Sequence, residues 1–102
     1  METNDLLACL LQVLGRTAMP PSEVRRVIGD RAKQLKAFNL CDGSNTLMEI
    51  GRKARIDSGN LSRSVARWRE HGIVFLIGTG NQARYLHIYP LSPKELRGPG
   101  SE

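Results

Sequence analysis

The residues of this chain best suited to a specific chemistry lie close together in its second half and combine small, amide, hydroxyl and guanidinium groups. They are Ser58, Gly59, Asn60, Ser62, Arg63 and Arg67. The Asn60 amide can pair with adenine through two hydrogen bonds, and the Arg63 guanidinium can pair with guanine in the same way. Ser58 and Ser62 carry short hydroxyl donors suited to phosphate oxygens. The chemistry that this set fits is hydrogen bonding to the base edges and backbone of a nucleic acid.

These side chains are predicted to lie on a capped helix over residues 58–71. Asp57 or Ser58 can cap its N-terminus, and Gly72 can end it. Three large apolar residues recur at i, i+4 and i+7 and should face the core: Leu61, Val65 and Trp68. The small and polar side chains between them then point away from the core.

The outward side of this helix carries Gly59, Asn60, Arg63 and Arg67. A helix that enters the major groove by its N-terminus needs small residues at its tip and polar or basic side chains one and two turns on. A solvated helix explains Arg67 and Arg69 equally well when each is taken alone. The elements on either side of the helix favour binding.

Before this helix, Thr46 and Glu49 have the spacing of a capping box, which predicts a short helix ending near Ala54 or Arg55. Its apolar residues are Leu47, Ile50 and Ala54.

After it, two β-rich runs surround the turn residues 78–81, which predicts a hairpin over residues 74–89. Arg84 is the only lysine or arginine of this hairpin. A contact of Arg84 with DNA and a plain hairpin are equally consistent with that position.

Helix, turn, basic helix and hairpin in this order resemble the winged helix-turn-helix family of the MarR or ArsR kind, over roughly residues 46–90. The resemblance rests on Leu47, Ile50, Ala54 and Ile56, on the segment 58–68, and on Gly72-Ile-Val74. It implies an α+β, mostly helical fold with two N-terminal helices and a C-terminal hairpin wing. It also implies DNA binding by a transcriptional regulator. We expect this regulator to bind double-stranded DNA sequence-specifically, with helix 58–71 in the major groove, and to repress by promoter occlusion; the sequence leaves activation open.

In that family, the groove is contacted by the positions that match Ser58, Gly59, Asn60, Ser62 and Arg63. No Cys-x-Cys motif or set of acidic and His ligands is present, so the resemblance implies no metal and we expect no cofactor. Whether the protein binds a small-molecule effector is left open. The alternative is a winged-helix adaptor that binds proteins, because fold does not determine function. An adaptor needs neither Asn60 nor Arg63, and its binding would depend weakly on salt.

A leucine-rich first helix is predicted from Asn4, which can cap it, to Gly15, which can end it. Its leucines cover more than the single stripe that a surface helix buries: Leu6, Leu7, Leu10, Leu11 and Leu14. Either the rest of the domain or a second copy of the chain covers the second face. We expect a homodimer, because palindromic DNA sites favour twofold symmetry.

The apolar pattern of residues 21–41 keeps its register across Gly29, which favours one long kinked helix. Two helices, the second capped by Asp30, are the alternative. The other face carries basic residues that either remain solvated or contact nucleic acid: Arg25, Arg26, Arg31, Lys33 and Lys36.

The chain has 102 residues, a formal net charge of +5 and 40% hydrophobic residues, which fits one domain over residues 1–91 and a flexible tail over 92–102. Cys9 and Cys41 lack metal-binding or disulfide spacing and are expected to be buried, reduced thiols. No apolar run approaches the ~20 residues that span a bilayer, so a cytoplasmic protein is expected. No catalytic motif is present, and we expect no enzymatic activity.

Overall fold

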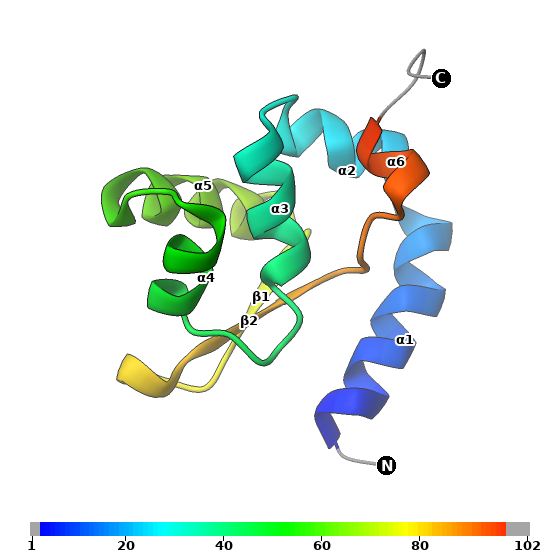
Figure 1. Ribbon diagram of the computed structural model, residues 1–102. Coiled ribbons are helices and arrows are strands. Elements are labelled where there is room, and N and C mark those ends of the chain that lie inside the picture. The colour runs from blue at the N-terminus through cyan, green and yellow to red at the C-terminus, as the bar shows by residue number, and fades with distance from the viewer. Residues whose placement is uncertain (1–2, 98–102) are drawn as a thin grey trace.

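The computed structural model describes residues 3–97, and in it a series of helices precedes a small antiparallel hairpin (Figure 1). The helices before the hairpin are α1 (Thr3–Ala18), α2 (Pro21–Ile28), α3 (Ala32–Leu40), α4 (Leu47–Ala54) and α5 (Ser58–Glu70). The remaining elements are β1 (Val74–Ile77), the 3-10 turn η1 (Gly80–Gln82), β2 (Arg84–His87) and the short helix α6 (Pro93–Arg97). The chain therefore has the α+β, mostly helical composition expected from its sequence.

An aromatic cluster joins α3, α5 and β2. Phe38 and Trp68 are completely buried, and their ring centroids lie 5.9 Å apart in an edge-on arrangement. The His87 ring packs on Phe38 with centroids 5.5 Å apart. Leu61 and Val65 are also buried, which confirms the predicted core side of α5.

The starts of α4 and α5 follow the capping signals of the sequence. The amide of Thr46 donates to Glu49 Oε1 (2.8 Å), and the amide of Glu49 donates to Thr46 Oγ1 (3.3 Å), so the predicted capping box is confirmed. Asp57, rather than Ser58, caps α5 by accepting a hydrogen bond from the amide of Asn60 (3.1 Å).

The end of α5 is a glycine-dependent turn that leads directly into β1. Gly72 has φ 73°, a region that side chains with a Cβ rarely adopt. The amide of Gly72 donates to the carbonyl of Arg69 (3.1 Å), and the amide of Ile73 donates to that of Trp68 (3.0 Å). These two bonds form a Schellman motif, which confirms Gly72 as the end of the helix.

The hairpin has a third chain segment along its second edge. The register pairs Val74 with His87, Phe75 with Leu86, Leu76 with Tyr85 and Ile77 with Arg84. On the other side of β2, the amide of His87 donates to the carbonyl of Cys41 (2.6 Å), and the amide of Gly43 donates to that of Tyr85 (2.8 Å). β2 therefore lies between β1 and residues 41–43, which ties the hairpin to the end of α3.

Gly29 separates α2 from α3, so the single kinked helix expected there is wrong. Its φ of 97° and ψ of −170° interrupt the helix in a conformation that favours glycine. Ile28 and Leu35 are both buried, so the apolar pattern stays in register although the backbone does not. The alternative cap is also wrong, because the N-cap of α3 is Arg31 and not Asp30.

Gly15 lies inside α1, which continues to Ala18, so the predicted helix end is wrong. A Cβ at Gly15 would lie 2.5 Å from Ile88 Cγ1 and 3.2 Å from Tyr89 Cδ2. The Tyr89 hydroxyl also donates to the carbonyl of Met19 (2.5 Å). Glycine is needed here because α1 approaches the segment after β2 very closely.

The last described residues differ from the flexible tail that was expected. Residues 93–97 form α6, which packs against α2. The amide of Glu95 donates to Ser92 Oγ (3.2 Å), the amide of Ser92 donates to Glu95 Oε1 (2.9 Å), and Leu96 packs against the core. Residues 98–102, and the side chain of Asn4 that was expected to cap the first helix, lie outside the described part of the chain.

The close approach at Gly15 can be tested by adding one methyl group. We expect Gly15→Ala to destabilise the protein by about 1–3 kcal/mol, because Ile88 and Tyr89 must move away from α1. Thermal unfolding followed by circular dichroism would measure it. Gly59→Ala is the matched control, since its Cβ would have no heavy atom closer than 3.5 Å, and it should be neutral or stabilising. Equal midpoints for Gly15→Ala and wild type would contradict the packing described.

Candidate nucleic-acid interface

The exposed side of α5 carries all the residues of this helix that the sequence indicated for binding: Ser58, Gly59, Asn60, Ser62, Arg63 and Arg67. At 3.6 residues per turn, Asn60, Arg63 and Arg67 form one row along the helix. Ser58 and Ser62 lie on the other flank. The structure therefore groups the predicted base-reading side chains and places the two serines apart from them.

A hydrogen-bonded chain orders the side chains at the start of α5. The Asn60 side-chain amide donates to Asp57 Oδ1, and Asn60 Oδ1 accepts a hydrogen bond from Arg63 Nη2. The backbone amide of Asn60, followed by its side-chain amide, lowers the pKa of the Asp57 carboxyl by hydrogen bonding. A carboxylate therefore holds Asn60 in place at neutral pH, and Asn60 in turn orients Arg63.

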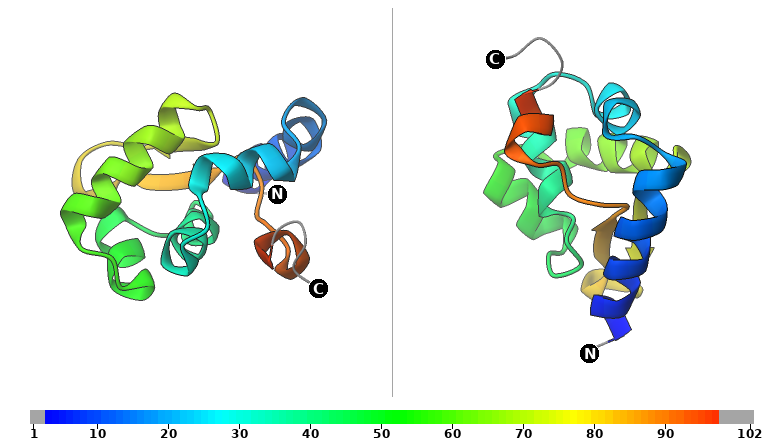
Figure 2. Two further views of the ribbon diagram at one scale, coloured as in Figure 1. Left: turned by 90° about the horizontal axis from the view of Figure 1, so that it is seen from above. Right: turned by 90° about the vertical axis from the view of Figure 1, so that its right-hand side faces the viewer.

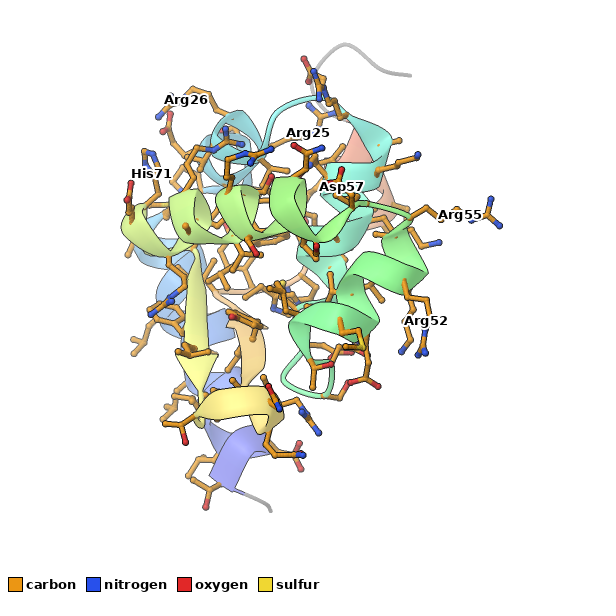
Figure 3. The ribbon with its side chains drawn as sticks, turned by 90° about the vertical axis from the view of Figure 1, so that its left-hand side faces the viewer. Arg25, Arg26, Arg52, Arg55, Asp57 and His71 are labelled. Atoms are coloured by element: carbon orange, nitrogen blue, oxygen red, sulfur yellow. The ribbon has the colours of Figure 1, made fainter. Side chains whose placement is uncertain are left out.

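A cleft of about 690 Å³ lies between the start of α3 and the row on α5. Cationic side chains from α3, from the turn between α4 and α5, and from α5 line it: Arg31, Lys33, Arg55, Arg63 and Arg67. Asp57 is the one acidic residue lining it among the residues that the structure describes. Sequence reasoning missed Arg55, because a single arginine in a turn carries no periodic pattern. Figure 3 shows Arg55 projecting outward from this turn, next to Asp57 at the start of α5.

The basic face expected on the second and third helices is only partly available to a ligand. The Arg25 side chain is 14% exposed, donates to the carbonyl of Leu96 (3.0 Å) and pairs with Asp30 (2.9 Å). Arg26 pairs with Glu23 (2.9 Å). The basic residues of this face that have no acidic partner within the described range 3–97 are Arg31, Lys33 and Lys36.

Arg84 lies apart from the cleft, in β2. It is half-buried, and its Nη1 donates to the carbonyl of Gln82 (3.0 Å). The pKa of Glu49 is lowered chiefly by hydrogen bonds from Thr46, with a smaller contribution from the positive charge of Arg84. Arg84 therefore lies near the start of α4, and the structure does not join it to the row on α5.

The leucines expected at a dimer interface form an exposed apolar stripe on α1. Its members and their exposed fractions are Leu6 (51%), Leu7 (38%), Leu10 (51%), Val13 (70%) and Leu14 (64%). Gly15 is buried and points to the rest of the protein from the opposite side of the helix. The side chain of Leu11, also expected in this interface, lies outside the described part of the chain.

The two cysteines differ in environment. Cys41 is buried, its thiol donates to the carbonyl of Ala37 (3.4 Å), and burial raises its pKa to about 12. Cys9 is exposed, so its expected burial is wrong, because α1 meets the rest of the chain through its Gly15 side. Within residues 3–97, no group of three or more His, Cys, Asp or Glu side chains is arranged to hold a metal ion.

Comparison of the chain with protein-family models, with characterised proteins and with solved structures finds no match. In the described part of the chain, every helix is too short or too polar to cross a membrane. The geometry of the site itself must therefore support any functional proposal.

The cap at Asp57 generates a prediction about pH. We expect Asp57→Ala to lower the thermal midpoint by several degrees at neutral pH, because it removes the cap of α5. The pKa of Asp57 is lower in the folded than in the unfolded protein. The contribution of the Asp57 carboxylate to stability is therefore complete above its unfolded-state pKa of about 3.9. This contribution is lost as the pH falls through the folded-state pKa.

Melting curves of both proteins between pH 7 and about pH 2 would show this as a shrinking difference in midpoint. Asp57→Asn is the control, since it keeps a capping oxygen without a titrating charge. A wild-type advantage over Asp57→Ala that is as large at the lowest pH as at neutral pH would contradict the assignment.

Proposed function

We propose that this chain is a winged helix-turn-helix protein that binds double-stranded DNA sequence-specifically and represses transcription by occluding a promoter. The observation that carries the proposal is the exposed row of Asn60, Arg63 and Arg67 beside a cleft lined by cationic side chains. An amide and guanidinium groups on one helix flank are the groups that read adenine and guanine.

The order of the elements supports this proposal. A helix, an extended segment along β2, two further helices and a hairpin follow one another from α3 onward, as in a winged helix domain. The 13 residues of α5 give a length of about 20 Å, and its side chains Asn60, Arg63 and Arg67 are exposed. A helix of this size fits the major groove, which is about 12 Å wide.

The start of α5 is shaped for close approach. Gly59 is exposed and lacks a side chain at the helix tip, so the backbone can approach a base edge. Ser58 and Ser62, on the other flank, are placed to donate to phosphates of one strand, while Arg67 lies toward the cleft. In this arrangement Asn60 and Arg63 read bases between two sets of phosphate contacts.

The apolar stripe of α1 favours a protein partner, and we propose that this partner is a second copy of the chain. The stripe is apolar throughout and carries no charge that would select a different partner, so two copies complement each other. The side chains of the stripe are exposed, and α1 is at the opposite end of the molecule from the start of α5 (Figure 2). Dimerisation through α1 would therefore leave α5 free. An adaptor would use the stripe as well, but it would leave the cationic side of α5 unused.

DNA binding can be tested with a double variant on α5. We expect Arg63→Ala, Arg67→Ala to weaken binding to a random-sequence duplex and to make the log–log salt dependence shallower by about 0.9 for each lost phosphate contact. Fluorescence anisotropy at several salt concentrations would measure both quantities.

The control is Arg26→Ala, Lys94→Ala, which removes the same charge from positions that do not line the cleft. If both double variants lowered affinity equally, only net charge would matter. If wild-type protein failed to bind at low salt, the adaptor function would become the better one.

The dimer can be tested with a charge in the stripe. We expect Leu10→Glu to raise the dimer dissociation constant roughly tenfold or more, because a buried leucine contributes about 1.5–3 kcal/mol. Sedimentation equilibrium would measure it, with circular dichroism to establish that the variant is folded. Ser22→Glu places the same charge at an exposed site of α2 and should leave the mass unchanged. A monomeric wild type, or a folded Leu10→Glu that remains dimeric, would exclude this interface.

A further inference from the structure

One residue of the cleft has a backbone conformation that its side chain does not favour. Arg55 ends α4 in the left-handed region, with φ 60° and ψ 48°, where a Cβ crowds the backbone and glycine is the usual residue. The other described residues with positive φ are all glycines: Gly29, Gly43, Gly72, Gly78 and Gly80. Glycine at position 55 would favour folding, so the arginine has to be explained by its side chain.

That side chain is placed to bind an anion. Arg55 is exposed, lines the cleft together with Arg31 and Lys33, and pairs with no acid in the described part of the chain. The cleft thus brings together cationic donors from α3 and from the turn before α5, and Asp57 is the one acidic side chain lining it among the described residues.

We propose that this cleft binds a backbone phosphate of the DNA strand that runs beside α5, with Arg55 as a principal contact. The inference rests on the DNA-binding function proposed above. A guanidinium offers a planar fork of donors that matches phosphate oxygens, and phosphate contacts determine the register of a protein on the duplex. Arg55 is therefore a positioning residue that determines where Asn60 and Arg63 meet the bases.

Arginine at position 55 should then strengthen DNA binding and lower the stability of the folded protein. The substitution Arg55→Gly tests both effects. We expect its thermal midpoint to rise, because glycine adopts the left-handed conformation without crowding. We expect its affinity for a random duplex to fall roughly tenfold. The log–log salt slope should become shallower by about 0.9, corresponding to one lost phosphate contact.

Arg52→Ala is the matched control. Arg52 is exposed three residues earlier on α4, outside the cleft, and its loss changes the net charge equally (Figure 3). We expect its salt slope to stay near that of wild type. A second experiment measures the binding of inorganic tripolyphosphate to wild type and to Arg55→Gly by isothermal titration calorimetry. It detects whether the cleft binds free polyphosphate.

The outcomes separate this inference from the proposed function. If wild type binds the duplex and Arg55→Gly binds with equal affinity and slope, the DNA function stands and the phosphate site does not. If Arg55→Gly is less stable than wild type, the strain argument is overturned. If wild type binds no duplex, both proposals fail; tripolyphosphate binding that is lost in Arg55→Gly would then assign the cleft to a free anion.

Discussion

The packing of Phe38 against Trp68 and His87 determines where the exposed row of α5 lies relative to α3 and to the hairpin. These three rings belong to α3, α5 and β2, so one buried cluster sets the distance of the exposed row of α5 from α3 and from the hairpin. The width of the cationic cleft follows from that distance, because one wall is α3 and the other is α5. Burial lowers the pKa of His87, which keeps its imidazole neutral at pH 7 and avoids placing a charge in this cluster.

Order at the tip of α5 has a cost for recognition. Asn60 already donates to Asp57 and accepts from Arg63, so reading an adenine means exchanging these hydrogen bonds for bonds to the base. The carboxylate of Asp57 also lies on the face that would meet phosphates, where it repels them. The cationic side chains around the cleft outnumber it. The network therefore gives a preorganised helix tip, and the surrounding charge offsets the repulsion that the cap introduces.

The structure confirms two signals confined to a few neighbouring residues, whereas the cap expected at Asp30 and the helix end expected at Gly15 are wrong. The capping box of Thr46 and Glu49 and the stop at Gly72 depend on hydrogen bonds within one turn of chain, so spacing alone reveals them. Gly15 has the same local appearance as a helix end, but its role is a contact with Ile88, far away in the sequence. At Gly29 the opposite error occurs: the helix is expected to continue, but the backbone breaks there. The break leaves the apolar periodicity intact, so the sequence pattern does not reveal it.

One part of the candidate site could be predicted from local periodicity, and another part could not. Leu61, Val65 and Trp68 define the inward side of α5 by periodicity, and the exposed position of Asn60 and Arg63 follows from them. The cleft does not follow, because it forms only when the separate helices α3 and α5 pack together. Cys9 is a similar case: an apolar neighbourhood in the sequence indicated burial, whereas α1 contacts the protein from its other side.

Glycine and arginine are used in opposite ways at the two ends of this molecule. At Gly15 the backbone conformation is an ordinary helix that any residue could adopt, and glycine is required because Ile88 leaves no room for a side chain. At Arg55 the backbone conformation itself favours glycine, yet the chain keeps a long cationic side chain on the surface. Packing explains the first choice. Arg55 is exposed and has no acidic partner in the described part of the chain, so the phosphate contact proposed above would account for the second.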